Sequence, residues 1–249
     1  MYVCPIRLKQ NWRADMHSDE NYGSKRFYYQ HVYVKMIGDQ ATGILNLLWR
    51  YPHKLMEKKF KSNQGLKILE VGYGNGEHFG FVTKDFASYT AIDINASAPE
   101  PTFLEKRSVF EYKSMNAEDL KLPSSHFDRL IATCLIVHLK DPEKALREWR
   151  RVLKPGAVAS IYLALEPSLA LRIFRILLTS RKAKKLGFNG YKLFIARDHI
   201  NYASGVMELI REVFKGDSIS QKYRPFPVPF WYINLFCIVD IKIDPKKNT

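Results

Sequence analysis

A short apolar segment that runs directly into three alternating glycines is the feature that most constrains the fold of this 249-residue chain. The segment is Lys67–Val71, and the glycines are Gly72, Gly74 and Gly76. A glycine-rich turn after a buried strand lets a ligand lie against the backbone at the carboxyl end of that strand, where a Cβ would hold it away. The pattern is typical of an open α/β sheet with a ligand at its carboxyl edge.

The rest of the chain alternates short apolar strands with amphipathic helices, which indicates a mostly parallel sheet with helices on both faces. An antiparallel hairpin with a proline-rich connection is predicted to close the sheet. The predicted strands are Lys67–Val71, Tyr89–Ile94, Glu111–Met115, Phe127–Cys134, Ala157–Leu163, Ser218–Tyr223 and Tyr232–Ile243.

Helices are predicted on either side of these strands. The clearest is Asp141–Leu153, which Pro155-Gly156 should end, and a second spans Tyr202–Phe214. Residues 25–60 also have a helical pattern, in which Pro52 should separate two helices. We therefore expect an N-terminal helical lid over residues 1–60 and a main domain over residues 61–249, with a helical insert at about 166–200.

The spacing of the glycines indicates which cofactor they serve. A dinucleotide fingerprint needs G-x-G-x-x-G, but here the third glycine comes one residue early and Glu77, which would repel a phosphate, follows it. Glu70 precedes the loop, where a carboxylate suits an ammonium group. Asp93 ends the next strand, at the place where a carboxylate accepts hydrogen bonds from ribose hydroxyls. These features favour S-adenosylmethionine (SAM), which carries an amino acid moiety and no phosphate.

Five ordered motifs resemble the class I SAM-dependent methyltransferase superfamily, within the group that includes ubiquinone-biosynthesis-type methyltransferases. They are Glu70–Gly76, Asp93, Asn116–Pro123 with Phe127-Asp128, Cys134–Leu146 and Arg150–Gly156. The resemblance implies a Rossmann-like doubly wound sheet of seven strands, mostly parallel with an antiparallel last strand, and it says little about the methyl acceptor. The residues it implies for SAM binding are Glu70, Gly72, Tyr73, Gly74, Gly76, Asp93, Ile94, Asn116, Ala117, Glu118 and Cys134.

His138 is the candidate catalytic residue, because it follows the fourth strand at the edge where ligands bind. An acceptor hydroxyl must lose its proton, and histidine is suited to take it near neutral pH. The alternative for His138 is a residue that caps a helix or flanks the cofactor. His199 is a weaker candidate, and His31 lies in an aromatic run at residues 27–33 that either closes over the site or packs on the domain.

The segment Leu169–Lys182 is amphipathic. Arg172, Arg175 and Lys182 share one predicted face, and the other face holds Ile173, Phe174, Leu177 and Leu178. Such a helix lies on an anionic membrane, covers a substrate pocket with its arginines toward a phosphate, or packs on the core with a solvated basic edge. The sequence leaves all three open.

The formal net charge of +14 favours anionic partners, among them phosphorylated small molecules, membrane surfaces and RNA. The three cysteines are far apart, so neither a disulfide framework nor a metal site is expected. No apolar run approaches the roughly 20 residues of a transmembrane helix, and we expect a cytoplasmic protein.

The leading hypothesis is a methyltransferase that acts on an oxygen or nitrogen of a small molecule such as a sugar, lipid precursor or metabolite. The alternatives are a tRNA-modifying methyltransferase and a non-catalytic SAM-binding partner subunit.

Overall fold

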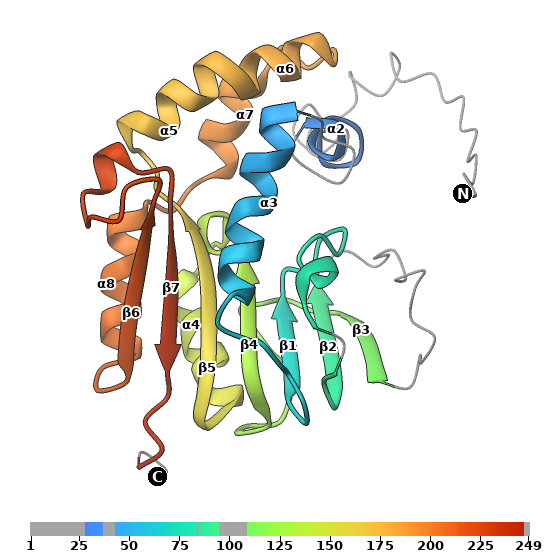
Figure 1. Cartoon of the computed structure of the whole chain (residues 1–249), viewed down its shortest axis with the longest axis vertical. Helices are drawn as coiled ribbons and strands as arrows, with labels where there is room; N and C mark the ends of the chain where they lie inside the picture. Colours follow the sequence, from blue (N-terminus) through green and yellow to red (C-terminus); the bar gives the residue numbers. More distant parts are fainter. Residues whose placement is uncertain (1–27, 37–42, 84, 95–108, 247–249) are drawn as a thin grey trace.

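The computed structural model describes residues 28–36, 43–83, 85–94 and 109–246, apart from the side chains of residues 29–31 and 34. Within these residues a seven-stranded sheet has the order β3-β2-β1-β4-β5-β7-β6 (Figure 1). Strands β1 to β5 are parallel, and β7 is antiparallel to its neighbours β5 and β6. The predicted Rossmann-like sheet is therefore confirmed. Its strands are β1 (Lys67–Val71), β2 (Ser88–Asp93), β3 (Phe110–Ser114), β4 (Phe127–Thr133), β5 (Leu153–Ala164), β6 (Ser218–Arg224) and β7 (Phe236–Lys242).

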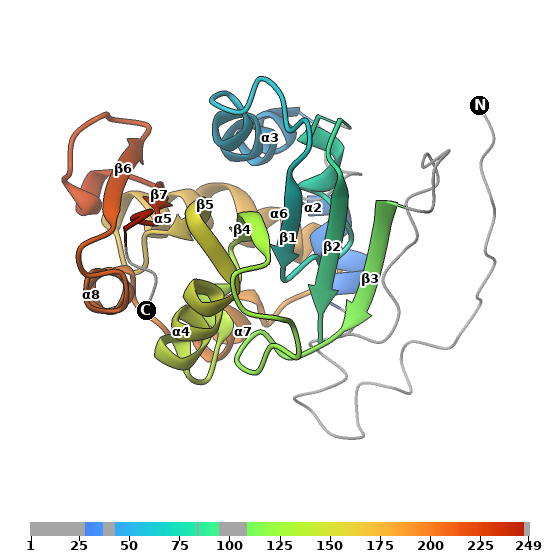
Figure 2. The same ribbon diagram turned by 90° about the horizontal axis from the view of Figure 1, so that it is seen from below.

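Helices cover both faces of the sheet (Figure 2). Helix α3 (Gly43–Glu57) lies on one face, and α4 (Pro142–Val152) and α8 (Ala203–Val213) lie on the other. The Asp141 side chain caps α4 by accepting a hydrogen bond from the Lys144 N–H at 2.9 Å. The predicted apolar face of α4 is buried in the main core, at Ala145, Leu146, Trp149, Val152 and Leu153.

One expectation about prolines was wrong. Pro52 does not separate two helices but lies inside α3. Tertiary packing explains the continuous helix, since Trp49, His53 and Met56 bury one stripe of α3 on both sides of the proline.

The predicted end of the helix before Pro155-Gly156 is confirmed, since α4 ends at Val152. The next strand begins earlier than expected, at Leu153, so Pro155 and Gly156 occupy an irregular stretch of β5. Leu153 pairs with Phe127 and Val158 with Arg129, so the strand gains residues relative to β4 there. Gly156 has a φ of +80°, which suits this irregularity.

An insert between β5 and α8 stands over the carboxyl edge of the sheet (Figure 1). It comprises α5 (Leu169–Phe174), the π-type turn η5 (Arg175–Thr179), α6 (Ser180–Lys185) and α7 (Tyr191–Asp198). Short helical turns η2 (Phe79–Phe81), η4 (Ile136–His138) and η6 (Trp231–Ile233) lie in other connections.

The N-terminal segment, η1 (Tyr28–Tyr33) and α2 (Val34–Met36), packs on this insert. The Tyr28 ring lies 4.3 Å from that of Phe194 and 5.3 Å from that of Phe188, centroid to centroid. Together with Val32, Met36, Leu45, Ala183 and Tyr191, these rings form a hydrophobic cluster distinct from the two clusters that flank the sheet.

The predicted faces of Leu169–Lys182 were only partly right. Phe174 and Leu178 pack toward the N-terminal segment, but Ile173 and Leu177 are each 47% exposed. Arg175 lies inside the fold, where it forms an ion pair with Glu166. The described part of the chain holds no helix that is both long and apolar enough to span a bilayer.

Candidate active site

The glycine loop lies between the carboxyl ends of β1 and β2. The backbone N–H groups of Gly72 and Tyr73 donate to the Ile92 carbonyl of β2 at 2.9 and 3.0 Å. Gly72, Gly74 and Gly76 all have positive φ, at +74°, +55° and +79°. An L-residue adopts such angles only with strain, so the loop depends on glycine for its path.

Two of the glycines are also required by packing within the protein. A Cβ on Gly72 would lie 2.9 Å from both δ-carbons of Leu135, and one on Gly76 would lie 2.8 Å from Cζ of Tyr73. The ring of Tyr73 is buried among Phe79, Phe110 and Tyr112. The buried ring of Tyr73 therefore supports the loop from below, which leaves its backbone for a ligand.

Asp93 ends β2 beside this loop. Its Oδ2 accepts a hydrogen bond from the Gly74 N–H at 2.9 Å, so the predicted ribose-binding residue and the glycine loop are in direct contact. Burial and the nearby Asp93 carboxylate raise the pKa of Tyr112 to about 12, which keeps this phenol neutral. Ile94, the next residue, is 75% exposed.

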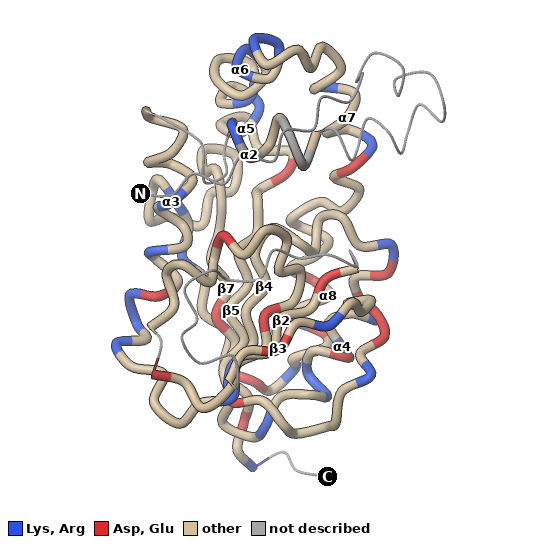
Figure 3. Tube along the Cα trace, turned by 90° about the vertical axis from the view of Figure 1, so that its right-hand side faces the viewer, with Lys and Arg blue, Asp and Glu red and all other residues tan. Residues whose placement is uncertain are grey.

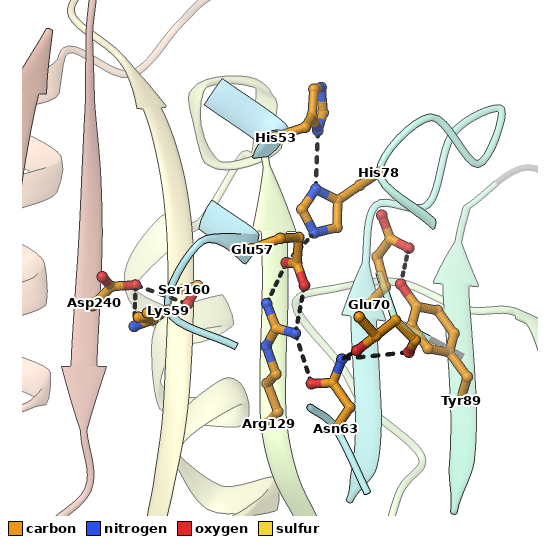
Figure 4. A network of polar contacts seen from close by, with 11 residues as sticks. His53, Glu57, Lys59, Asn63, Glu70, His78, Tyr89, Arg129, Ser160 and Asp240 are labelled. Carbon is orange, nitrogen blue, oxygen red and sulfur yellow. Dashed lines mark hydrogen bonds and ion pairs between the residues drawn. The ribbon is translucent and has the colours of Figure 1, made fainter. Parts of the chain in front are cut away.

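Glu70 is buried at the end of β1, where it accepts a hydrogen bond from the Tyr89 hydroxyl (Figure 4). Burial and the Glu70 carboxylate raise the pKa of Tyr89 well above its ordinary value. A carboxylate that is out of water and held by a neutral hydroxyl favours a nearby cation.

The predicted residues after β3 and β4 lie at the same edge of the sheet. The Asn116 amide oxygen accepts from the Glu118 N–H at 2.9 Å, and Glu118 accepts from the N–H groups of Lys140 and Asp141. Ala117 is buried, and its carbonyl accepts from the Trp149 indole. These contacts join the loop after β3 to the start of α4.

Cys134 follows β4 with a φ of +52°. Burial raises the pKa of its thiol to about 12. The thiol is therefore protonated at neutral pH and is no nucleophile.

The residues of this edge fit SAM. Two carboxylates, Glu70 and Asp93, flank the loop, and residues 70–78 contain no lysine or arginine. Such a donor set suits an ammonium group, a sulfonium and ribose hydroxyls, and it disfavours a pyrophosphate. The positive-φ glycines supply the exposed backbone that a flat cofactor needs.

His138 ends η4, the turn that follows β4. The same connection carries Leu135 against Gly72, so η4 lies next to the glycine loop. His138 Nδ1 is 3.0 Å from both the carbonyl oxygen and Oδ2 of Asp198. A carbonyl accepts only, so Nδ1 carries the hydrogen and Nε2 of the neutral ring carries the lone pair.

A second histidine stands beside the first. The rings of His138 and His199 are 4.8 Å apart and almost perpendicular. His199 Nδ1 lies 2.8 Å from Glu166 Oε1 and 3.1 Å from Arg175 Nη2. Burial, together with the charges of His138 and Arg175, lowers the pKa of His199, so this ring is neutral at neutral pH.

His138, Asp198 and His199 also present ligand atoms within 4.8 Å of one another, the separation of a metal site. Arg175 places a permanent positive charge against one of these rings. That charge opposes a bound cation, so the arrangement is better suited to proton transfer.

Three residues that contact His138 or His199 were not predicted from the sequence as part of the site: Asp198, Glu166 and Arg175. Only the adjacency of Asp198 to His199 pointed to the first. Glu166 follows β5 and Arg175 lies in the insert, and the fold alone brings them together. Of the proposed lid, residues 1–27 and the side chain of His31 lie outside the described residues.

The known proteins that this chain resembles are methyltransferases. Residues 69–161 match the family model described as a methyltransferase domain. A ubiquinone/menaquinone biosynthesis C-methyltransferase of Shewanella sediminis is 27% identical over 162 residues, which cover 56% of this chain and 64% of that protein. A 2-methyl-6-phytyl-1,4-hydroquinone methyltransferase of Oryza sativa is 34% identical over 120 residues, covering 45% and 35%. The chain thus spans less than two thirds of the length of these relatives.

Solved structures share the fold at low identity. The N-methyltransferase NodS of Bradyrhizobium japonicum, in complex with S-adenosyl-L-homocysteine, superposes with a TM-score of 0.55 at 11% identity, covering 93% of this chain and 96% of that one. A methyltransferase of Haloferax volcanii in complex with the activator Trm112 gives 0.54 at 14% identity, covering 82% and 94%. Residues 69–161 therefore carry a methyltransferase domain, and the sheet has the Rossmann-like fold of class I methyltransferases, which use S-adenosylmethionine.

Proposed function

We propose that this protein transfers the methyl group of SAM to a small-molecule acceptor, with His138 taking the proton that the acceptor loses. The acceptor atom is an oxygen or a nitrogen, or a carbon beside a hydroxyl group. A carbon acceptor is included because one of the two relatives named above is a C-methyltransferase and the other is a hydroquinone methyltransferase. The observation that carries the proposal is the contact between His138 Nδ1 and Asp198 beside the glycine loop.

The residues of the carboxyl edge would divide the work between cofactor and acceptor. The glycine loop, Glu70 and Asp93 would hold SAM, which supplies a methyl group on a sulfonium whose positive charge is lost on transfer. Asp198 keeps the hydrogen of His138 on Nδ1, so Nε2 accepts the proton of an acceptor hydroxyl or ammonium group.

The cofactor part is tested by calorimetric titration of the full chain with SAM. Replacing Asp93 with alanine should weaken binding at least tenfold, because one carboxylate holds both the loop and the ribose. Glu208→Ala, which removes an exposed carboxylate on α8, should leave the affinity unchanged. Wild-type protein that does not bind SAM would contradict the assignment.

The acceptor part is tested by mass spectrometry of phenols, hydroquinones, amines, sugars and tRNA after incubation with protein and SAM. We expect a small molecule to gain one methyl group. His138→Gln should lower kcat about 100-fold with little change in KM. His126→Gln, at the opposite end of β4, is the control. Methylation of tRNA alone, SAM binding without transfer to any acceptor, or an unchanged His138→Gln rate would each contradict the proposal.

A further inference from the structure

Two segments that are far apart in the sequence meet at one corner of the molecule (Figure 1). One is the insert helix formed by α5, η5 and α6, and the other is the connection between β6 and β7, residues 225–235. Ser168 joins them, since its hydroxyl caps α5 and donates to the Asn234 carbonyl at 2.8 Å. Asn234 in turn fixes the connection by donating to the carbonyls of Val228 and Phe230. The corner is therefore a defined surface.

This corner exposes large apolar side chains. The described residues contain sixteen exposed large hydrophobic residues, and nine of them lie on these two segments. The exposed fraction reaches 58% at Leu169 and 66% at Phe230. Apolar side chains that gather in this way mark an interaction site. We call this set the apolar face: Leu169, Ile173, Ile176, Leu177, Phe226, Val228, Phe230, Tyr232 and Ile233.

The same corner carries much of the positive charge of the chain. Residues 169–185 contain six lysines and arginines and no acidic residue, a net charge of +6 out of the +14 of the whole chain, and only Arg175 of the six is drawn into the fold, by Glu166. Basic residues gather along α5 and α6, and the acidic residues lie mostly nearer the sheet (Figure 3). The exposed cations of the insert helix are Arg172, Arg181, Lys184 and Lys185.

We propose that the apolar face docks on an anionic membrane surface. Its apolar side chains would enter the boundary between headgroups and acyl chains, and the surrounding cations would contact anionic headgroups. Each lysine or arginine near such a surface raises binding about fivefold. The insert leaves the sheet at the end of β5, so docking brings the carboxyl edge close to the membrane.

Nucleic acid and protein fit this surface less well. RNA phosphates would pair with the cations, but six of the nine apolar side chains are aliphatic and cannot stack on bases. A protein interface is usually depleted in lysine at its core, whereas Lys184 and Lys185 share the insert helix with Ile176 and Leu177. An anionic bilayer matches both kinds of side chain.

The test is flotation of the full chain with vesicles of phosphatidylcholine alone or mixed with phosphatidylglycerol. The wild-type protein should float with the mixed vesicles, and high salt should lower the fraction that floats. With vesicles of phosphatidylcholine alone, the protein should remain at the bottom of the gradient. Ile173→Ser combined with Phe230→Ser should lower the partition coefficient at least tenfold, and Tyr202→Ser, an exposed apolar residue outside the face, should not. Lys184→Glu combined with Lys185→Glu should also lower it at least tenfold, with Lys246→Glu as the control.

A second measurement reports the orientation. Trp231 stacks on Tyr232 at the apolar face, whereas Trp149 is fully buried in the core. The chain also contains Trp12 and Trp49, so brominated lipids should quench the fluorescence of the wild-type protein more strongly than that of Trp231→Phe.

Several outcomes would overturn the proposal. They are no flotation with mixed vesicles, equal flotation of the Ile173→Ser/Phe230→Ser variant, and quenching that is undiminished in Trp231→Phe. If the protein does not bind vesicles but binds tRNA, and the same variants abolish that binding, the face belongs to RNA. If it does not bind vesicles but self-associates, and the same variants abolish self-association, the face belongs to a second copy of the chain. Vesicle binding requires no methyl acceptor, so its failure is distinguishable from failure of the proposed reaction.

Discussion

Gly72 shows how one residue satisfies a backbone requirement and a packing requirement together. Its φ of +74° belongs to the left-handed region, and a Cβ there would lie 2.9 Å from both δ-carbons and 3.1 Å from the Cβ of Leu135. Moving the Leu135 side chain alone cannot relieve a contact that reaches its Cβ. Leu135 begins the turn that leads to His138, so any shift of the glycine loop is passed to the candidate base.

We expect Gly72→Ala to destabilise the protein by about 2–4 kcal/mol, the sum of an unfavourable φ and a steric clash. Gly65→Ala is the matched control, because Gly65 has the same φ of +74° and nothing within 4 Å of an added Cβ. It should cost only about 1–2 kcal/mol. Urea denaturation measures both variants, and equal losses would show that Leu135 does not constrain Gly72.

At the scale of elements, the attachment of α3 to the sheet rests on a buried ion pair. Glu57, in the last turn of α3, forms an ion pair with Arg129 of β4, which is fully buried (Figure 4). His78 Nε2 donates a hydrogen bond to the same carboxylate at 2.9 Å, and its Nδ1 lies 2.9 Å from Nδ1 of His53. Asn63 accepts a further hydrogen bond from Arg129 at 3.1 Å. The ion pair thus attaches the C-terminal end of α3, a helix that contains Pro52, to strand β4.

This ion pair predicts a dependence of stability on pH. Burial raises the pKa of Glu57, but hydrogen bonds from His78 and Arg129 outweigh it and lower the pKa from 4.5 to about 2. A lowered folded-state pKa contributes stability that is present above pH 4.5 and is lost as the pH falls toward 2. The contribution is about 3 kcal/mol.

Glu57→Gln should therefore be less stable than the wild type at pH 7, and the difference in free energy of unfolding should shrink below about pH 4.5. Denaturant titrations between pH 7 and the onset of acid unfolding measure this difference. Glu208→Gln removes an exposed partner of Arg211 and should change the stability little at any pH. A difference that stays constant with pH would rule out the ion pair as its source.

At the scale of the whole molecule, the chain buries its apolar residues in separate clusters. Two flank the sheet, and the third joins the N-terminal segment to the insert through Tyr28, Phe188 and Tyr191. The third cluster shares no strand with the others. It should therefore open independently of the sheet core, as weakly coupled cooperative units do.

Tyr28→Ala should loosen this cluster selectively, because the ring contacts Phe188, Tyr191 and Phe194. We expect amide hydrogen exchange in α6 and α7 to accelerate about 100-fold, equivalent to about 3 kcal/mol, with β1 and β4 unchanged. Tyr202→Ala, which truncates a side chain that is 60% exposed, should change neither region. Acceleration throughout the sheet would show that the clusters unfold as one unit.

The sheet was predictable because each strand carries its own pattern. β1, β2 and β4 are runs of buried residues bounded by turns, and the glycine loop fixes which end binds the cofactor. Asp93 lies beside the loop because both follow adjacent parallel strands, and it accepts a hydrogen bond from the Gly74 N–H; its role in binding ribose stays a prediction. The glycine spacing with Glu70 and Glu77 was enough to favour SAM over a dinucleotide.

Other features depend on contacts between distant segments, which local patterns do not encode. Pro52 is tolerated because α3 packs on the sheet, and Pro155-Gly156 belongs to β5 because β4 pairs on both sides of it. Arg175 lies inside the fold because it pairs with Glu166, whereas Ile173, expected on the packed face, is 47% exposed. The sequence alone determined the sheet, the loop and the cofactor, since these follow from periodicity and backbone sterics. Only the tertiary structure brought Asp198 to His138 and the insert to the β6–β7 connection, since long-range packing decides which side chains meet.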